Sequence, residues 1–418
     1  MNDPLVNTGC GGHDAPSITL DEALARIRRA LRPASLVERV PVRAALGRVL
    51  AETVVSEADV PPHDNSAMDG YALRHADAGN GPLKIVGSAF AGHPFSGRVG
   101  SGECVRIMTG GVVPEGADTV VMQEHCRAED DQVRVERCPA VGANIRRAGE
   151  DLPHDEPVLE PGRRLTAADL GVLVSAGRAE VSVHYRLRAA FFSTGDELRS
   201  VGQLLDEGTI YDSNRYTLHG MLSRLGADVL DLGVVRDDPD ALRRALQDAA
   251  AHADVILTSG GVSVGSADFV TQVLAEIGQI GFWTVSVKPG RPLAFGHIGD
   301  AAFFGLPGNP VSSMVTFTQI VTPALRHLAG EKPRPPVRFR ARCTTALRKK
   351  PGLLEFQRGI LSTGGDGLPE VTPFGRQGSG ILRSMSCADC FILLPLEGAD
   401  LAVGDWVTVE PFAGPLGV

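Results

Sequence analysis

A loop of small residues near the middle of the chain has the residue types and spacing for chemistry. It carries serines, glycines and a final carboxylate, at Ser259, Gly260, Gly261, Ser263, Gly265 and Asp268. Glycines let a backbone approach an anion closely, and N–H groups at the start of a following helix point at it. The final carboxylate favours a metal ion between the protein and a phosphate. A turn that only joins two elements remains the alternative on this stretch alone.

The elements on either side of the loop are a strand and a helix. Residues 254–258 have the composition of a buried strand, and apolar residues recur at helical spacing over 269–277. Strand, small-residue loop and helix are the usual layout of a phosphate or nucleotide site. From residue 188 to 330 strands and helices alternate, which predicts a doubly wound, mostly parallel α/β domain.

Other polar loops follow the predicted strands of this domain. Ligands bind beyond the carboxyl ends of parallel strands, so these loops should meet at one rim. The rim would combine carboxylates, cations and small residues: Thr194, Gly195, Asp196, Glu197, Asp237, Asp238, Lys288, Arg291, Pro307, Asn309 and Pro310. Hard oxygen ligands without a His or Cys cluster favour Mg²⁺ over zinc. Carboxylates, Mg²⁺ and two cations around a glycine loop suit a phosphate-containing substrate.

Some of these acidic residues also fit structural roles. Asp238 precedes Pro239 and has the position of a helix N-cap, which leaves Asp237 as the better candidate ligand. Asp196 and Glu197 could instead be solvated loop charges.

The rest of the chain falls into segments with different strand and helix patterns. Residues 54–150 contain short strand patterns between Gly and Pro turns and predict a β-rich insertion domain. The flanking segments 17–53 and 151–187 predict a small helical linking domain. Residues 331–418 predict a C-terminal β-barrel-like domain, and residues 1–16 a disordered tail.

Composition excludes several classes of protein. The 418-residue chain has a formal net charge of -9 and no basic run, which argues against nucleic-acid binding. No segment has the apolar length of a membrane span, and the first residues lack a signal-peptide core. The seven cysteines are irregularly spaced, which favours a reducing compartment over a disulfide scaffold. We therefore expect a cytoplasmic protein that binds neither nucleic acid nor membranes.

The motifs, taken in order, resemble those of one family. The resemblance is to the bacterial MoeA family of molybdopterin molybdenumtransferases, which is similar to the C-terminal domain of gephyrin. It extends over essentially everything after about Ser17. The matching stretches are 64–71, 108–110, 146–151, 193–198, 211–214, 236–238, 259–265, 288–290, 306–310 and 377–379.

This resemblance implies a reaction and its partners. Molybdate would be inserted into the dithiolene of adenylylated molybdopterin, with release of AMP and a requirement for Mg²⁺. The family also implies an elongated homodimer, whose clefts lie between the α/β domain of one protomer and the β insertion of the other. The adenylyltransferase of the same pathway and recipient molybdoenzymes would be further partners.

Roles for individual residues also follow from the resemblance. Asp69 and Thr109 would reach in from the partner protomer, and Ser379 would come from the C-terminal domain. Lys288 and Arg291 would hold anionic groups. Lys is frequent in the family at the position of Arg291, so a planar guanidinium here replaces a point charge.

An acidic set completes the implied site. Asp151, Glu197, Asp237 and Asp268 would surround Mg²⁺ and molybdate, with Glu197, Asp237 and Asp268 as the metal ligands.

Two other functions are compatible with parts of the chain. An ATP-dependent molybdopterin adenylyltransferase would need only the α/β domain, so the β insertion and the C-terminal domain argue against it. A non-catalytic scaffold or binding protein would not need the acidic set.

Overall fold

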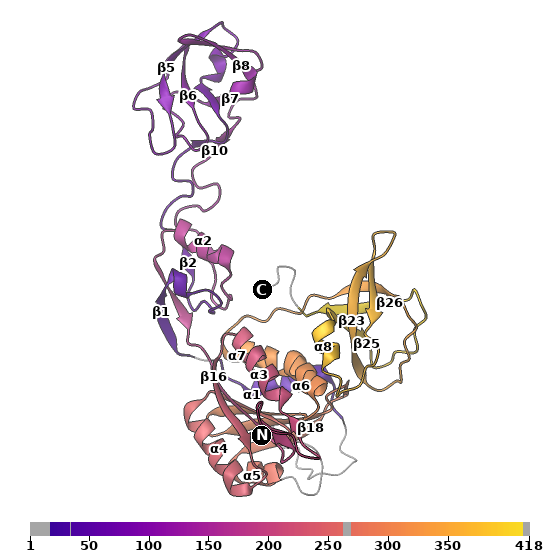
Figure 1. The fold of residues 1–418 in the computed structure, drawn as a ribbon. Helices are drawn as coiled ribbons and strands as arrows, with labels where there is room; N and C mark the ends of the chain where they lie inside the picture. Colours follow the sequence, from indigo (N-terminus) through magenta and orange to yellow (C-terminus); the bar gives the residue numbers. More distant parts are fainter. Residues whose placement is uncertain (1–16, 34, 262–268, 413–418) are drawn as a thin grey trace. The chain divides into compact units, whose positions relative to one another are not determined.

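The computed structural model describes residues 17–33, 35–261 and 269–412 (Figure 1). It divides into two compact units. One unit combines Met1–Leu36 with His184–Val418, and the other is Val37–Val183. The predicted disordered tail, residues 1–16, lies outside the described residues. The finer division into a linking, an insertion, an α/β and a C-terminal domain with the bounds given above stays a prediction.

A six-stranded sheet forms the centre of the α/β domain, in the order β16-β13-β17-β21-β20-β18. β20 is antiparallel to both of its neighbours, and the other three pairings are parallel. All strands except β20 therefore run in one direction, which confirms the predicted mostly parallel sheet. The strands are β13 (Arg188–Thr194), β16 (Asp228–Val235), β17 (Val255–Ser259), β18 (Gln279–Thr284), β20 (Pro292–Ile298) and β21 (Ala301–Leu306).

Helices cover both faces of this sheet because side chains alternate along each strand. Phe191 packs on the face covered by α1, α3, α6 and α7, and Phe192 packs on the face covered by α4 and α5 (Figure 1). Both phenylalanines are completely buried. The helices are α1 (Leu20–Ala30), α3 (Ser213–Arg224), α4 (Pro239–His252), α5 (Phe269–Ile277), α6 (Pro310–Thr316) and α7 (Thr322–Leu328).

Helix α1, whose residues fall in the predicted linking domain, packs against the α/β sheet. Its apolar residues Leu20, Ala23 and Ile27 are buried in the same core as Phe191. An amphipathic helix goes where its apolar stripe can be buried, and the sheet face offers that surface.

A π-helical stretch interrupts the helical segment that follows residue 309. η4 (Phe317–Val321) joins α6 to α7 without a break in the chain of helical residues. Pro323 follows directly in α7 and has no N–H to donate to the preceding turn, so the wider turn accommodates it.

The C-terminal strands close into a five-stranded barrel, as predicted. They follow the order β23-β24-β22-β26-β25, and β25 pairs back to β23. The short β19 (Val287–Lys288), which lies between β18 and β20 in sequence, pairs with β23. The barrel strands are β22 (Phe339–Cys343), β23 (Leu354–Thr363), β24 (Pro369–Pro373), β25 (Cys390–Leu394) and β26 (Trp406–Pro411), and α8 (Arg383–Cys387) precedes β25.

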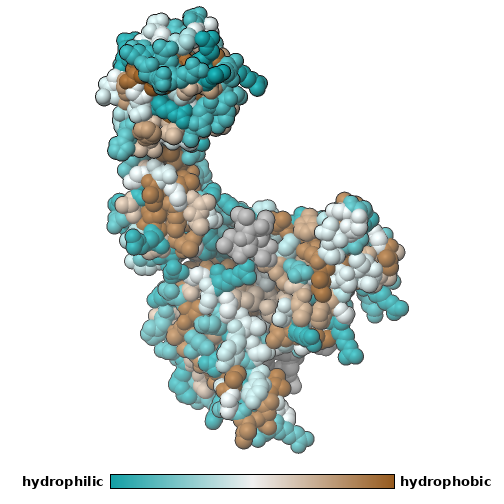
Figure 2. Space-filling view, turned by 45° about the horizontal axis from the view of Figure 1, so that its top comes forward, coloured by the Kyte–Doolittle hydropathy of each residue, from teal (hydrophilic) through white to brown (hydrophobic). Residues whose placement is uncertain are grey.

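The second unit contains the predicted β-rich insertion as a six-stranded sheet, in the order β7-β4-β6-β5-β9-β8. Tyr71 and Leu73 belong to one core of this sheet, and Ala72 belongs to the other. On the face shown in Figure 2, hydrophilic residues cover most of the part that contains this sheet, at the top of the view. The strands are β4 (Gly70–Leu73), β5 (Leu83–Ala89), β6 (Glu103–Ile107), β7 (Thr119–Met122), β8 (Cys126–Glu129) and β9 (Gln132–Val135).

The remainder of the second unit contains fewer helices than expected for a helical linking domain. Within the described residues its one α-helix is α2 (Ala167–Ser175), which Thr166 caps through its hydroxyl. Short strands supply the rest, in the pairs β1 (Val37–Pro41) with β12 (Glu180–His184), β2 (Val54–Val55) with β11 (Pro157–Leu159) and β3 (Asn65–Ser66) with β10 (Ile145–Arg146).

Two further observations concern the whole described chain. None of its helices has the length and apolar character needed to cross a membrane. Its described cysteines, Cys104, Cys126, Cys138, Cys343, Cys387 and Cys390, are free thiols.

Candidate active site

A cavity of about 740 Å³ lies at the carboxyl ends of β13, β17 and β21. It is where the α/β sheet was expected to bind a ligand. The predicted site residues that line it are Thr194, Gly195, Glu197, Asp237, Ser259, Gly260, Gly261, Pro307, Asn309 and Pro310. The alternative that the glycine loop only joins two elements is therefore not favoured.

Two carboxylate side chains, Glu197 and Asp237, line this cavity, whereas the neighbouring Asp238 does not. Asp238 caps α4, with its carboxylate accepting from the N–H of Ala241 at 2.7 Å, as the sequence predicts. Asp237 lines the cavity and accepts a hydrogen bond from the hydroxyl of Thr194. The Thr194 hydroxyl thus orients one oxygen of Asp237, and the side chain is otherwise exposed.

The main chain next to these carboxylates requires glycine at two positions. Gly195 has a φ of 146°, and a Cβ there would lie 2.5 Å from a carboxylate oxygen of Glu197. Gly260 has a φ of 91°, and a Cβ there would lie 2.7 Å from the carbonyl oxygen of Thr194. Its N–H donates to the Leu306 carbonyl at 3.1 Å, so it is not available for an anion as the loop pattern suggested.

Asn214 is a site residue that was not predicted, although the 211–214 stretch was recognised as a motif. It lies in the first turn of α3, which Asp212 caps, and it is only 8% exposed. Its Nδ2 donates to the Ser259 hydroxyl and to the Gly308 carbonyl, both at 2.7 Å. Asn214 therefore joins the end of β17 to the loop that follows β21.

Unused acceptors remain beside this junction. The Oδ1 of Asn214 and the Oδ2 of Asp212 are buried, and neither has a hydrogen-bond partner in the described part of the chain. Both residues line the cavity, so these oxygens are candidates to accept from a ligand. Further lining residues that were not predicted are Leu198, Ile210, Tyr211, Ser213, Pro292, Gly308, Gly380 and Leu382.

Neither Lys288 nor Arg291 is among the residues that line the cavity. Arg291 directly precedes the lining residue Pro292 and has an exposed side chain. The Lys288 side chain is 58% exposed, and its Nζ lies 3.3 Å from a carboxylate oxygen of Glu355 in β23. The C-terminal barrel thus contacts one of the two predicted cations.

Ser379 is also adjacent to the lining. Its carbonyl accepts from the N–H of Val311 at 3.0 Å, and the next residue, Gly380, lines the cavity. Arg358 supports this loop from the barrel, since its guanidinium donates to the Gly378 carbonyl at 3.2 Å. Burial lowers the pKa of Arg358 to about 10.

The predicted residues of the second unit lie on its own loops. Asp69 accepts from the N–H of Thr109 at 2.8 Å and from its hydroxyl at 2.7 Å. These bonds, the N–H first and the hydroxyl second, lower the pKa of Asp69. Asp151 is exposed, and its N–H donates to the Val60 carbonyl at 3.0 Å. Asp64 accepts from the N–H of Ala148 at 2.9 Å.

Three predicted residues lie outside the described residues: Ser263, Gly265 and Asp268. Within the described ranges no group of three or more His, Cys, Asp or Glu side chains is placed to hold a metal ion. Glu197 and Asp237 do line one cavity, and the described residues of its lining include neither His nor Cys. This oxygen-only donor set fits the chemistry of Mg²⁺.

Replacing Asn214 with Ala tests its part in the site. The substitution removes two hydrogen bonds and leaves the buried Ser259 hydroxyl without its donor. We expect the free energy of unfolding to fall by about 1–3 kcal/mol, as measured by denaturant titration. Asn80→Ala is the control, because the Asn80 amide bonds a carbonyl in an exposed turn. An equal change in both variants would contradict the role of Asn214.

Replacing Thr109 tests the hydrogen bonds on Asp69. In Thr109→Val the hydroxyl is lost and the N–H remains, so the pKa of Asp69 should rise but stay below its ordinary value. Hydrogen bonds to a carboxylate favour its charged form, which gives this direction. Carbon-13 NMR titration of labelled aspartate measures the pKa, and Thr109→Ser should leave it unchanged. An unchanged pKa in the valine variant would show that the hydroxyl contributes nothing.

Comparison with known proteins shows the family to which the chain belongs. Family models match along the chain: the MoeA N-terminal region (domain I and II) at 18–177, a probable molybdopterin-binding domain at 190–327 and the MoeA C-terminal region (domain IV) at 340–412. The molybdopterin molybdenumtransferase of Haemophilus influenzae is 43% identical over 96% of this chain and 100% of its own. That of a Nostoc species is 37% identical over 89% of this chain and 88% of its own.

A solved structure agrees with these sequence relatives. The crystal structure of the molybdopterin biosynthesis MoeA protein from Pyrococcus horikoshii is similar with a TM-score of 0.81. The two sequences are 28% identical, and the match covers 95% of this chain and 100% of the other. The chain belongs to the MoeA family of molybdopterin molybdenumtransferases.

Proposed function

We propose that this enzyme inserts molybdate into the dithiolene of adenylylated molybdopterin and releases AMP. The relatives that match almost the whole chain are named molybdopterin molybdenumtransferase, which supports this proposal. The observation that carries it is the cavity at the carboxyl edge of the sheet, where Glu197 and Asp237 lie beside a glycine loop. Neither an adenylyltransferase nor a scaffold is favoured, because relatives that carry the molybdenumtransferase name match nearly all of the chain.

Different residues of the chain would bind different parts of the substrate. Loops containing Gly195 and Gly260 let the substrate approach the backbone. The buried acceptors on Asp212 and Asn214 would take hydrogen bonds from donor groups of the adenylylated pterin. Lys288 and Arg291 would bind its anionic groups or molybdate, which holds the oxyanion near the thiolates.

Mg²⁺ belongs to the same proposal. Glu197 and Asp237 would hold the ion together with Asp268, and a bound Mg²⁺ would offset the charge of the phosphate and molybdate. The Thr194 hydroxyl would keep Asp237 in a fixed orientation for this task.

The active form is proposed to be a homodimer with shared sites, in which Asp69 and Thr109 contribute to the cavity of the partner. The resemblance of their motifs to the family and the fixed orientation of the Asp69 carboxylate support this arrangement. Further interactions would be with the adenylyltransferase that supplies the substrate and with molybdoenzymes that receive the product. A cytoplasmic location fits the free thiols of the described cysteines.

AMP release from adenylylated molybdopterin, with and without molybdate and Mg²⁺, tests the reaction. We expect release only when both ions are present. Asp237→Asn and Glu197→Gln should each slow it at least about 100-fold, because each removes a charge aimed at the reacting groups.

Asp240→Asn is the matched control for these carboxylates. Asp240 lies in the same region of the chain but pairs with Arg243 on the surface of α4, so its loss should leave the rate unchanged. No AMP release under any condition would exclude the proposed reaction. A wild-type rate in Asp237→Asn would exclude the metal site.

Mixing two inactive variants tests the shared site. Asp69→Asn and Glu197→Gln are each expected to be inactive alone. In a shared arrangement, mixed dimers have one site in which both residues are intact, so co-expressed variants should regain about a quarter of wild-type activity. Activity no higher than that of either variant alone would show that each site is built within one protomer.

A further inference from the structure

A buried carboxylate of the barrel, Glu355, pairs with the predicted cation Lys288. Glu355 is only 3% exposed. Its Oε2 accepts from the Nζ of Lys288 and from the Nε2 of Gln357, both at 3.3 Å. Its Oε1 lies 3.8 Å from the Nζ of Lys349. A carboxylate this deeply buried is stable only with such partners.

Strand pairing sets the contact between Glu355 and Lys288. β19 and β23 run parallel, with Val287 opposite Leu354 and Lys288 opposite Glu355. The N–H of Leu354 donates to the Ser286 carbonyl at 2.8 Å. The backbone therefore holds the two charged residues side by side across the junction of the α/β domain and the barrel.

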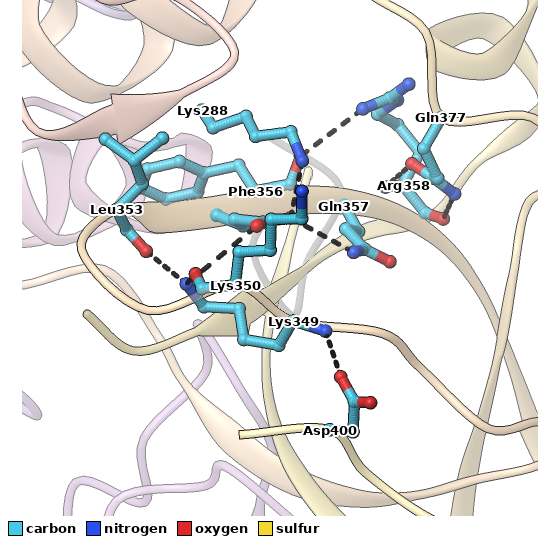
Figure 3. Close-up of polar contacts among 10 residues, drawn as sticks. Lys288, Lys349, Lys350, Leu353, Phe356, Gln357, Arg358, Gln377 and Asp400 are labelled. Carbon is cyan, nitrogen blue, oxygen red and sulfur yellow. Dashed lines mark hydrogen bonds and ion pairs between the residues drawn. The ribbon is translucent and has the colours of Figure 1, made fainter. Parts of the chain in front are cut away.

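Lys349 is fixed more firmly than Lys288. Its side chain is completely buried, and its Nζ donates to the carbonyls of Lys350 at 2.7 Å and Leu353 at 2.5 Å (Figure 3). The cluster of Lys288, Glu355 and Lys349 thus contains two ammonium groups and one carboxylate. Because Lys349 shares the carboxylate, the cluster keeps a net positive charge, and its exposed member is Lys288.

We propose that Glu355 is a positioning residue, which holds the Lys288 ammonium so that Lys288 can bind an anionic group of the substrate. Lys349 balances the carboxylate and preserves the positive charge that Lys288 presents. This inference rests on the proposed function and gives the C-terminal barrel a part in substrate binding. A preformed ammonium loses less conformational freedom on binding than a free lysine side chain would.

The first test separates substrate binding from turnover. In Glu355→Gln the KM for adenylylated molybdopterin should rise about three- to tenfold, with a smaller change in kcat, as expected when a ground-state contact weakens. In a Lys288→Met background the same substitution should have no further effect, because Glu355 acts through Lys288. Glu370→Gln is the control, since Glu370 is a barrel carboxylate that pairs with Arg342 at 3.1 Å.

A second measurement does not depend on turnover. Acylation of Lys288 by an N-hydroxysuccinimide ester, followed by mass spectrometry, reports how firmly its amine is held. The rate should rise about two- to fivefold in Glu355→Gln, the range for a partly exposed ion pair. The exposed Lys84 of β5 should react at the same rate in both proteins. Because Lys349 would lose its charge partner, Glu355→Gln/Lys349→Met serves as the variant if the single substitution does not fold.

The outcomes separate the two proposals. An unchanged acylation rate at Lys288 overturns the positioning role, as does an unchanged KM or an additive effect in the Lys288→Met background. Absence of AMP release from the wild-type protein would overturn the proposed function instead, and the acylation rate would still decide whether Glu355 holds Lys288.

Discussion

The shared direction of β13, β17 and β21 is the constraint on which the candidate site depends. Parallel pairing puts Ser193 opposite Ser259 and Ser259 opposite Leu306, so the strands end at the same edge of the sheet. The loops that follow must then meet, and the glycine at 260 allows one of them to pass close to the Thr194 carbonyl. Asn214 stabilises the arrangement, because its amide donates both to the last residue of β17 and to the loop after β21.

The local placement of charged groups matters more for this site than the net charge of the chain. A chain with a formal charge of -9 can bind an anionic substrate when cations are fixed beside it or a divalent ion offsets its carboxylates. Asp237 is free for that role because the neighbouring Asp238 is occupied as the cap of α4. Lys288 is held by a carboxylate that it shares with Lys349, so the pairing does not cancel the local positive charge.

Much of the fold could be predicted because its signals are local. The N-cap Asp238 with Pro239 set the start of α4, and buried apolar runs marked β13 and β17. β20 was not predicted, because Gly296 interrupts its run of strand-type residues. The glycine is needed there, since a Cβ at this position would lie 2.0 Å from the Gln279 carbonyl oxygen. The sequence does not show where α1 packs, since an apolar stripe shows that a helix packs but not on which surface.

The sequence by itself determined the family resemblance, the order of strands and helices, and the loops that carry carboxylates and glycines. The prediction that polar loops meet at one rim of the sheet agrees with the presence of Glu197 and Asp237 in one cavity. The carboxyl ends of parallel strands lie at the same edge of a sheet, however far apart the strands are in the chain. Tertiary structure alone decided the contacts of Asn214 and Glu355. Their partners Ser259 and Lys288 are 45 and 67 residues away, and no local periodicity encodes a contact across that separation.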